Sequence, residues 1–268
     1  MKKNIITTFL AMSLALLTAC SGQPSGDAID TQASRPAASD AQTTEPVDSD
    51  SSSSETQASE TAEATPSGTQ TPESSAEDKV SVEALVGIYT EPTYTYENEF
   101  IGIGCQLDQD WEVLDQAEIA ELNGVQNDTI TDETIAEQMK NGRFMPFYAK
   151  KEGGLIGANI VVADLGASFG SILTESAYVN LSISQLAPAL EAGGISDVAT
   201  QATTVLFAGG QHAAVTASGN VDGLGFYETI VCVKVDQYMV VITASCVSVD
   251  VTDDILDMFY VLETEGGE

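Results

Sequence analysis

The segment LGFYETIVCVKV, Leu224–Val235, is separated by only two polar residues from the segment YMVVITASCV, Tyr238–Val247. Both segments are rich in β-branched and aromatic residues, and a two-residue polar connection is typical of a hairpin turn. This pattern predicts two antiparallel strands in which Val231 lies opposite Ile242. Because both strands are apolar on both faces, we expect other elements to cover the sheet on both sides.

Further strands extend this hairpin toward the N-terminus. Alternating segments separated by glycine-containing turns predict strands at Thr203–Ala208 and His212–Ser218, which gives a four-stranded meander. Phe144–Lys150 and Leu155–Ala163 predict a second hairpin across a Glu-Gly-Gly turn. The segment FIGIGCQL, Phe100–Leu107, also alternates, and the bare glycines on one of its faces allow a packed element to approach closely.

Helices are expected where a capping residue precedes a suitable segment, at Asp115–Leu122, Thr131–Met139 and Thr252–Leu262. The longest helix begins after Thr174, and Pro188 inside it should kink or shorten it. Runs of strands with few helices between them favour an antiparallel sheet over a doubly wound parallel one. The predicted fold class is therefore α+β, a mainly antiparallel sheet with helices on both faces, which is an α/β/α sandwich.

Six residues form a spaced pattern of aromatic, amide, glycine and apolar side chains: Tyr96, Asn98, Gly102, Ile103, Leu107 and Trp111. This pattern resembles the opening of the PsbP/Mog-like superfamily, although Asp108 stands where a proline is usual. The segments Phe100–Trp111 and Tyr227–Met239 are similar to those of clostridial-type surface lipoproteins, an uncharacterised family of Gram-positive bacteria. The resemblance implies the PsbP/Mog-like α/β/α fold but no activity, because function does not follow from fold.

The first twenty residues have the organisation of an export signal. Lys2 and Lys3 precede the apolar stretch Ile5–Leu17, which is too short to span a bilayer. The stretch ends in Leu-Thr-Ala-Cys at Cys20, which resembles the lipobox of bacterial lipoproteins. The resemblance implies that the Cys20 thiol receives a diacylglyceryl group with palmitate-type chains. We therefore expect a lipid-anchored protein on the extracellular face of the cell membrane.

Composition divides the chain into three segments. We expect residues 1–20 to be a signal peptide, of the lipoprotein type by the resemblance of its lipobox, residues 21–79 to be a tether, and residues 80–268 to be one domain, PsbP/Mog-like by the resemblance described above. The tether consists of small and polar residues without any aromatic side chain, so it cannot bury enough surface to offset the entropy of ordering. Its twelve acidic residues outnumber Arg35 and Lys79, so we expect a disordered, self-repelling spacer.

The charge balance restricts the partners. The chain has 41 acidic and 9 basic residues, a formal net charge of −32. A nucleic-acid backbone must be met by clustered lysines and arginines, so we expect no nucleic-acid partner. The expected partners are the membrane, through the Cys20 lipid, and an unknown protein or small ligand.

No constellation of catalytic or metal-binding residues stands out. The sequence contains a single histidine, His212, and no G-x-S-x-G motif that would supply a nucleophilic serine for it. We therefore expect His212 to have a structural role beside its turn. Asp108, Asp110 and Glu112 have the spacing of a calcium loop but lack its glycine and its final glutamate. We therefore predict no catalytic residue, no metal site and no cofactor.

Three cysteines remain besides Cys20. An odd number leaves at least one thiol free or paired between molecules. In the predicted hairpin Cys232 and Cys246 point to opposite faces, so a bridge between them is the least favoured. A bridge from Cys105 to either of them, or three buried free thiols, both stay open.

These observations predict a lipid-anchored extracytoplasmic binding or interaction module of unknown ligand, without enzymatic activity. Two alternatives stay open at this point. One is a cell-surface hydrolase acting on wall or dietary polymer, and the other is an assembly factor of an envelope complex.

Overall fold

A computed structural model describes residues 85–125, 130–140 and 142–262. Its largest unit is a seven-stranded sheet with strand order β4-β5-β6-β10-β9-β8-β7, in which all neighbours are antiparallel. The strands are β4 (Glu112–Val113), β5 (Phe144–Lys151), β6 (Ile156–Asp164), β7 (Ser196–Phe207), β8 (Gly210–Val221), β9 (Leu224–Val235) and β10 (Tyr238–Val247). The predicted hairpin of β9 and β10 is confirmed, including the pairing of Val231 with Ile242.

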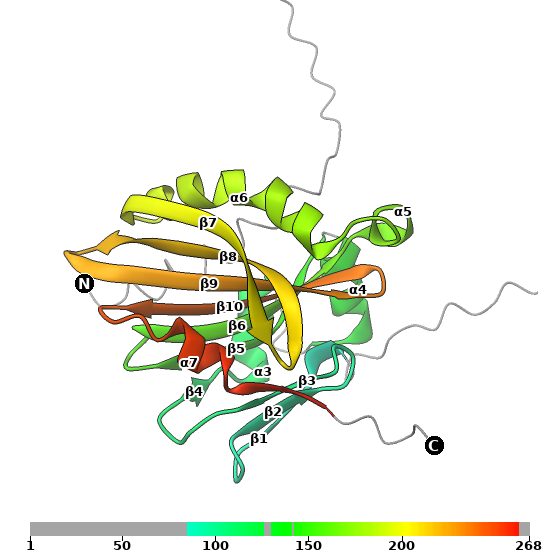
Figure 1. The fold of residues 1–268 in the computed structure, drawn as a ribbon. Coiled ribbons are helices and arrows are strands. Elements are labelled where there is room, and N and C mark those ends of the chain that lie inside the picture. The colour runs from blue at the N-terminus through cyan, green and yellow to red at the C-terminus, as the bar shows by residue number, and fades with distance from the viewer. Residues whose placement is uncertain (1–84, 126–129, 141, 263–268) are drawn as a thin grey trace, which may run out of the picture. The chain divides into compact units, whose positions relative to one another are not determined.

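A second, four-stranded sheet has the order β1-β2-β3-β11. Its strands are β1 (Ile88–Thr90), β2 (Thr95–Asn98), β3 (Ile103–Gln106) and β11 (Phe259–Val261). Figure 1 shows this small sheet below the large one, with β11 joining it from the far end of the chain. Gly104 on β3 meets the ring of Tyr260 on β11, which is the close approach predicted for this glycine face.

Five helices complete the described part of the chain: α3 (Gln116–Leu122), α4 (Asp132–Lys140), α5 (Gly166–Gly170), α6 (Glu175–Ala192) and α7 (Thr252–Leu256). Helix α3 begins with a capping box, in which Asp115 accepts from the Glu118 amide and Glu118 accepts from the Asp115 amide. Helix α6 begins at the predicted cap, Thr174, whose hydroxyl accepts from the Ala177 amide.

Two apolar layers lie on the two faces of the large sheet. On one face α6, which Figure 1 shows above the sheet, covers the strands. It packs there through Tyr178, Val179, Leu186 and Leu190. On the other face the small sheet covers the core. There the rings of Phe207 on β7 and Phe259 on β11 lie 5.4 Å apart, because β7 and β8 bend toward the small sheet.

The expected α/β/α sandwich with helices on both faces is therefore wrong. A second sheet, assisted by the short α7 and by α4, takes the place expected for a helical layer. Strands that are apolar on both faces must be covered on both faces, but the pattern does not tell whether helices or a second sheet provide the cover. Alternation in Phe100–Leu107 did indicate β3, but β1, β2 and β11 are three or four residues long, too short for their periodicity to be recognised in the sequence.

Two helices end elsewhere than expected or run on past an expected break. Helix α6 is not shortened at Pro188 but runs to Ala192, with the proline on the exposed side and Leu186 and Leu190 packed in the core. The last helix ends at Leu256 instead of Leu262, and the chain then becomes β11.

Candidate functional site

A cavity of about 510 Å³ lies on the face of the large sheet that α7 and the small sheet share. Its sheet floor carries alternating side chains of three strands, and α7 with the turn before it forms a wall. We call this cavity the hydroxyl cleft, and the polar side chains that define it are Gln201, Thr216, Ser218, Tyr227, Thr229, Asp250, Thr252 and Asp253.

The cleft exists because each strand changes character along its length. Where the small sheet covers this face, β7 and β9 present apolar side chains such as Phe207, Val231 and Val233. Beyond that cover the same face presents hydroxyls and an amide. The polar end of this face is thus the part that the small sheet does not bury.

The strand register arranges these polar groups as a lattice. Thr216 on β8 lies opposite both Gln201 on β7 and Thr229 on β9, and Ser218 lies opposite Tyr227. Neighbouring strands are about 4.8 Å apart, and positions i and i+2 are about 6.8 Å apart along a strand. One ligand can form hydrogen bonds to several of these side chains at once only if it carries several polar groups of its own.

The α7 wall is held in place by a chain of hydrogen bonds. The Thr229 hydroxyl donates to the Thr252 hydroxyl at 3.1 Å, and the latter donates to Asp250 Oδ1 at 2.8 Å. The Thr252 amide also donates to Asp250 Oδ1, at 3.1 Å. Because Thr229 and Thr252 are each 4% exposed, the Asp250 carboxylate is fixed in orientation by buried groups.

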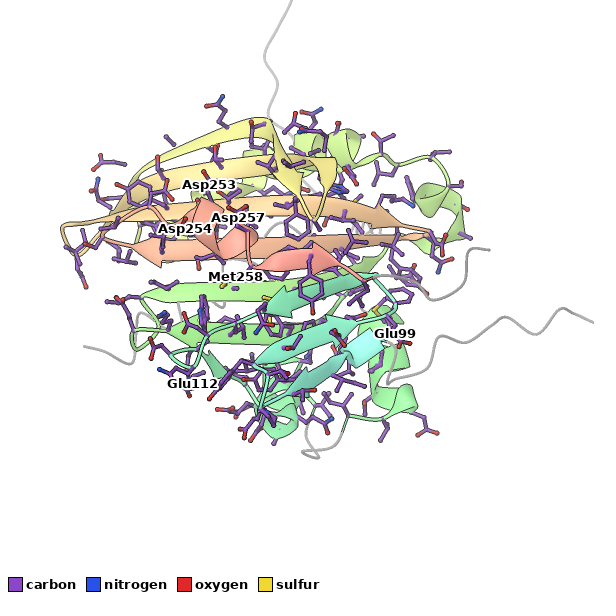
Figure 2. The ribbon with its side chains drawn as sticks, turned by 60° about the horizontal axis from the view of Figure 1, so that its bottom comes forward. Glu99, Glu112, Asp253, Asp254, Asp257 and Met258 are labelled. Atoms are coloured by element: carbon purple, nitrogen blue, oxygen red, sulfur yellow. The ribbon has the colours of Figure 1, made fainter. Side chains whose placement is uncertain are left out.

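Figure 2 shows Asp253, Asp254 and Asp257 projecting from α7. Asp253 lies on the side of the helix toward strands β7–β9, and of these three it alone lines the cleft. The charged side chains on the cleft surface are therefore carboxylates, and no lysine or arginine of the described residues lines it.

Glu228 lies in the floor of the cleft through its backbone position, but its side chain is on the other face. Alternation along β9 puts it on the same face as Phe226 and Ile230, beneath α6. The residue is 2% exposed, and neither carboxyl oxygen has a hydrogen-bond partner among the described residues. Burial raises the pKa of Glu228 to about 8, so the carboxyl group is mostly neutral at pH 7.

His212 has the structural surroundings that we expected. Its Nδ1 lies 3.0 Å from Glu175 Oε1, and its Nε2 is packed against Gly210, the first residue of β8. Glu175 also accepts from the backbone amides of Ala213, at 3.2 Å, and Lys234, at 2.9 Å. This arrangement attaches the start of α6 to strands β8 and β9.

A buried thiol lies near this pair, but its chemistry does not favour attack on a substrate. Burial, with a smaller contribution from the Glu175 charge, raises the pKa of Cys232 to about 12. A nucleophilic cysteine needs a lowered pKa and access to solvent, and Cys232 has neither.

All three cysteines of the described domain are free and buried. Burial raises the pKa of Cys105 to about 12 and also raises the pKa of Cys246, whose Sγ accepts from the Val251 amide at 3.3 Å. Cys232 belongs to the apolar layer beneath α6, whereas Cys246 lies on the opposite face of the sheet, in accord with the predicted register. These thiols serve as small core side chains in this structure.

Two lysines of β5 pair with three carboxylates of β4 and the turn before it. Lys151 Nζ lies 2.8 Å from Asp108 and 3.7 Å from Asp110, and Lys150 Nζ lies 2.9 Å from Glu112. Within residues 85–262, apart from the undescribed gaps, no group of three or more His, Cys, Asp or Glu could hold a metal ion.

The residues of the PsbP/Mog-like pattern are structural here. The Tyr96 hydroxyl donates to the Val86 carbonyl at 2.9 Å, and Asn98 Nδ2 donates to the Leu85 carbonyl at 2.9 Å. The Asn98 side-chain oxygen accepts from the Ile101 amide at 3.2 Å. Both side chains are buried and hold the incoming chain against the small sheet, so the pattern specifies packing.

The residues of the cleft were not predicted from the sequence to form one site. A usable signal does exist, namely Thr216, Ser218 and Asn220 alternating along the second half of β8. Cys20, the signal peptide and the tether lie outside the described residues. Within the described part, no helix is long and apolar enough to cross a membrane.

Comparison with known proteins adds little. No protein-family model matches the chain, and no curated protein matches it. Among solved structures, the chain is similar to LpqN, described as involved in cell envelope biogenesis of Mycobacterium tuberculosis. The identity is 8%, the match covers 60% of this chain and 83% of LpqN, and the TM-score is 0.32. A similarity at this level carries no argument about function.

Proposed function

We propose that this protein is a lipid-anchored extracytoplasmic binding module whose binding site is the hydroxyl cleft. The lipobox-like sequence at Cys20 and the acidic tether support the anchor. The same features, with the segments Phe100–Trp111 and Tyr227–Met239, support kinship with clostridial-type surface lipoproteins. In this proposal the tether carries the folded domain away from the membrane, and the cleft captures a ligand there.

One observation carries the choice of site. The cleft combines a cavity of about 510 Å³, large enough for a small molecule or a few units of a polymer, with several hydroxyl groups along its floor. Ser218 and Thr216 offer hydroxyls on β8, and the half-buried Tyr227 offers an aromatic face with a polar end. These groups favour a ligand with several hydroxyls of its own, such as an oligosaccharide.

The binding test removes hydroxyls from the cleft floor without changing its shape. The double variant Thr216→Val with Ser218→Ala is compared with Thr204→Val, whose side chain lies on the other face of β7. Calorimetric titration of the full lipidated chain in detergent with neutral and aminated trisaccharides measures affinity. We expect about a tenfold loss for each hydrogen bond removed and no change in Thr204→Val. Equal affinity in all three proteins contradicts the proposed site.

The anchor test uses Cys20→Ser beside Ser21→Ala. Detergent phase partition and labelling with a radioactive fatty acid measure acylation in cells. We expect the Cys20 variant to lose label and leave the detergent phase, while the Ser21 variant behaves like the unaltered protein. An unlabelled wild-type chain contradicts the anchor and leaves the cleft untouched.

A further inference from the structure

The polar groups of the hydroxyl cleft divide into two sets. The sheet floor carries neutral polar side chains, namely Gln201, Thr216, Ser218, Tyr227 and Thr229. The α7 wall carries the carboxylates of Asp250 and Asp253. A purely neutral ligand would need only the floor. Which group of a ligand contacts the wall carboxylates is a question that rests on the proposed function of the cleft as a binding site.

The wall carboxylates have no basic partner within the described residues. Lys150 and Lys151 are paired with the acidic turn before β4, and the lining of the cleft contains neither lysine nor arginine. Asp250 accepts from Thr252 through Oδ1 alone, so its second oxygen is available to a ligand. Asp253 is exposed and takes part in none of the salt bridges among the described residues.

The wall is preorganised for a cation in a way that the surrounding surface is not. The hydroxyl and the amide of Thr252 both donate to Asp250 Oδ1, and the buried Thr229 hydroxyl holds the Thr252 hydroxyl in turn, so a ligand need not order the carboxylate. The cleft also lies on a domain with 29 acidic and 5 basic residues from Val80 onward. A concave site in such a domain concentrates positive ligands and excludes anionic polymers.

We infer that the ligand of the hydroxyl cleft is an amine-bearing polyol, an amino sugar with a free ammonium group as its simplest form. The ammonium group donates to the carboxylates of Asp250 and Asp253. The sugar hydroxyls exchange hydrogen bonds with Thr216 and Ser218 on the floor. An ammonium group has three donors and no acceptor, which suits a wall that offers acceptors only.

Three matched probes test this inference with the full lipidated chain in detergent: the glucosamine trimer, its N-acetylated form and cellotriose. They share ring number and most hydroxyls and differ in charge. Titration at low ionic strength should give at least tenfold tighter binding of the glucosamine trimer than of either neutral probe. Added salt should reduce that preference, because part of the attraction is screened.

The decisive variant is Asp253→Asn, with Asp257→Asn as the control from the same helix outside the cleft. We expect Asp253→Asn to bring the three affinities within about twofold of one another by weakening only the aminated probe. Asp257→Asn should retain the wild-type preference. Asp250→Asn, combined with a thermal unfolding curve, provides a second variant for the wall.

The outcomes separate the two proposals. Equal binding of aminated and neutral probes overturns the charge inference but leaves the cleft as a sugar site. Equal loss in Asp253→Asn and Asp257→Asn also overturns it, because the attraction then belongs to the whole acidic surface. If no probe binds to the wild type or to any variant, both the charge inference and the proposal that the cleft binds sugars are wrong.

Discussion

Glu228 places a carboxyl group within an apolar layer, between the large sheet and α6. Its neighbours across the strands are Ser245 on β10 and Ala217 on β8, and neither oxygen has a partner among the described residues. Such a group remains protonated because an unpaired buried charge is costly. Tyr148 and Cys232 belong to the same layer, and burial raises the pKa of each to about 12. Both therefore stay neutral between about pH 4.5 and pH 8.

The protonation of Glu228 links folding to pH. Below about pH 4.5 the carboxyl is protonated in both states, whereas above it the unfolded chain releases the proton and the native chain keeps it until about pH 8. The contribution of Glu228 to stability is therefore lost as pH rises through this window, at about 1.4 kcal/mol per pH unit. Urea unfolding of Glu228→Gln between pH 5 and 8 should show a shallower fall than the wild type.

The control for this prediction is Glu121→Gln, which removes the same charge from an exposed position on α3. Its pH dependence should follow that of the wild type. Identical slopes in Glu228→Gln and the wild type would mean that Glu228 ionises in the native state.

Helix α6 depends at its first turn on one carboxylate. Glu175 accepts from His212 and from two strand amides, so it joins the helix to β8 and β9. Removing the carboxylate leaves two backbone donors without this acceptor, whereas removing the imidazole leaves both amide bonds in place. The loss of a partner costs about 1–3 kcal/mol for each buried donor.

We therefore expect Glu175→Ala to lower the free energy of unfolding by about 2–4 kcal/mol, and His212→Ala by less. Chemical denaturation measures both. Glu191→Ala, at an exposed position in the last turn of the same helix, should remain within about 0.5 kcal/mol of the wild type. A larger effect from His212 than from Glu175 would contradict the anchoring role.

Elements with strong local signals were predictable from the sequence, and those held by distant contacts were not. The turn at Asp222 and Gly223 has the positive φ angles that Asp-Gly favours, and it joins two strands as expected. The three-residue β11 is a strand only because β3 lies beside it. The hydroxyl cleft was missed for the same reason, since Thr216 and Ser218 become a floor only where a distant sheet stops covering them.

At the scale of the whole molecule, charge opposes compaction. From Val80 onward 29 acidic residues stand against 5 basic ones, and three lysine–carboxylate pairs near β4 and β5 neutralise only a small part of that excess. Repulsion between exposed carboxylates raises the free energy of the compact state more than that of the expanded chain. Salt shortens the range of this repulsion to about 10 Å at 0.1 M.

Raising NaCl to about 0.5 M should therefore raise the unfolding temperature, measured by circular dichroism. The double variant Asp254→Asn with Asp257→Asn, outside the cleft, should start from a higher unfolding temperature and gain less from salt. A wild-type curve that does not respond to NaCl would contradict this account.

The pairing of β11 with β3 has a consequence for the order of events during biosynthesis. Tyr260 on β11 donates to Glu97 on β2, 163 positions earlier in the chain. The strands that emerge first from a ribosome or a secretion channel must therefore wait for the last segment before their sheet is complete. Closing so long a loop is slow, and the unfinished edge of β3 stays open to wrong pairing meanwhile. Truncation shortly before Phe259 would thus leave a chain with an open strand edge that proteases and chaperones can recognise.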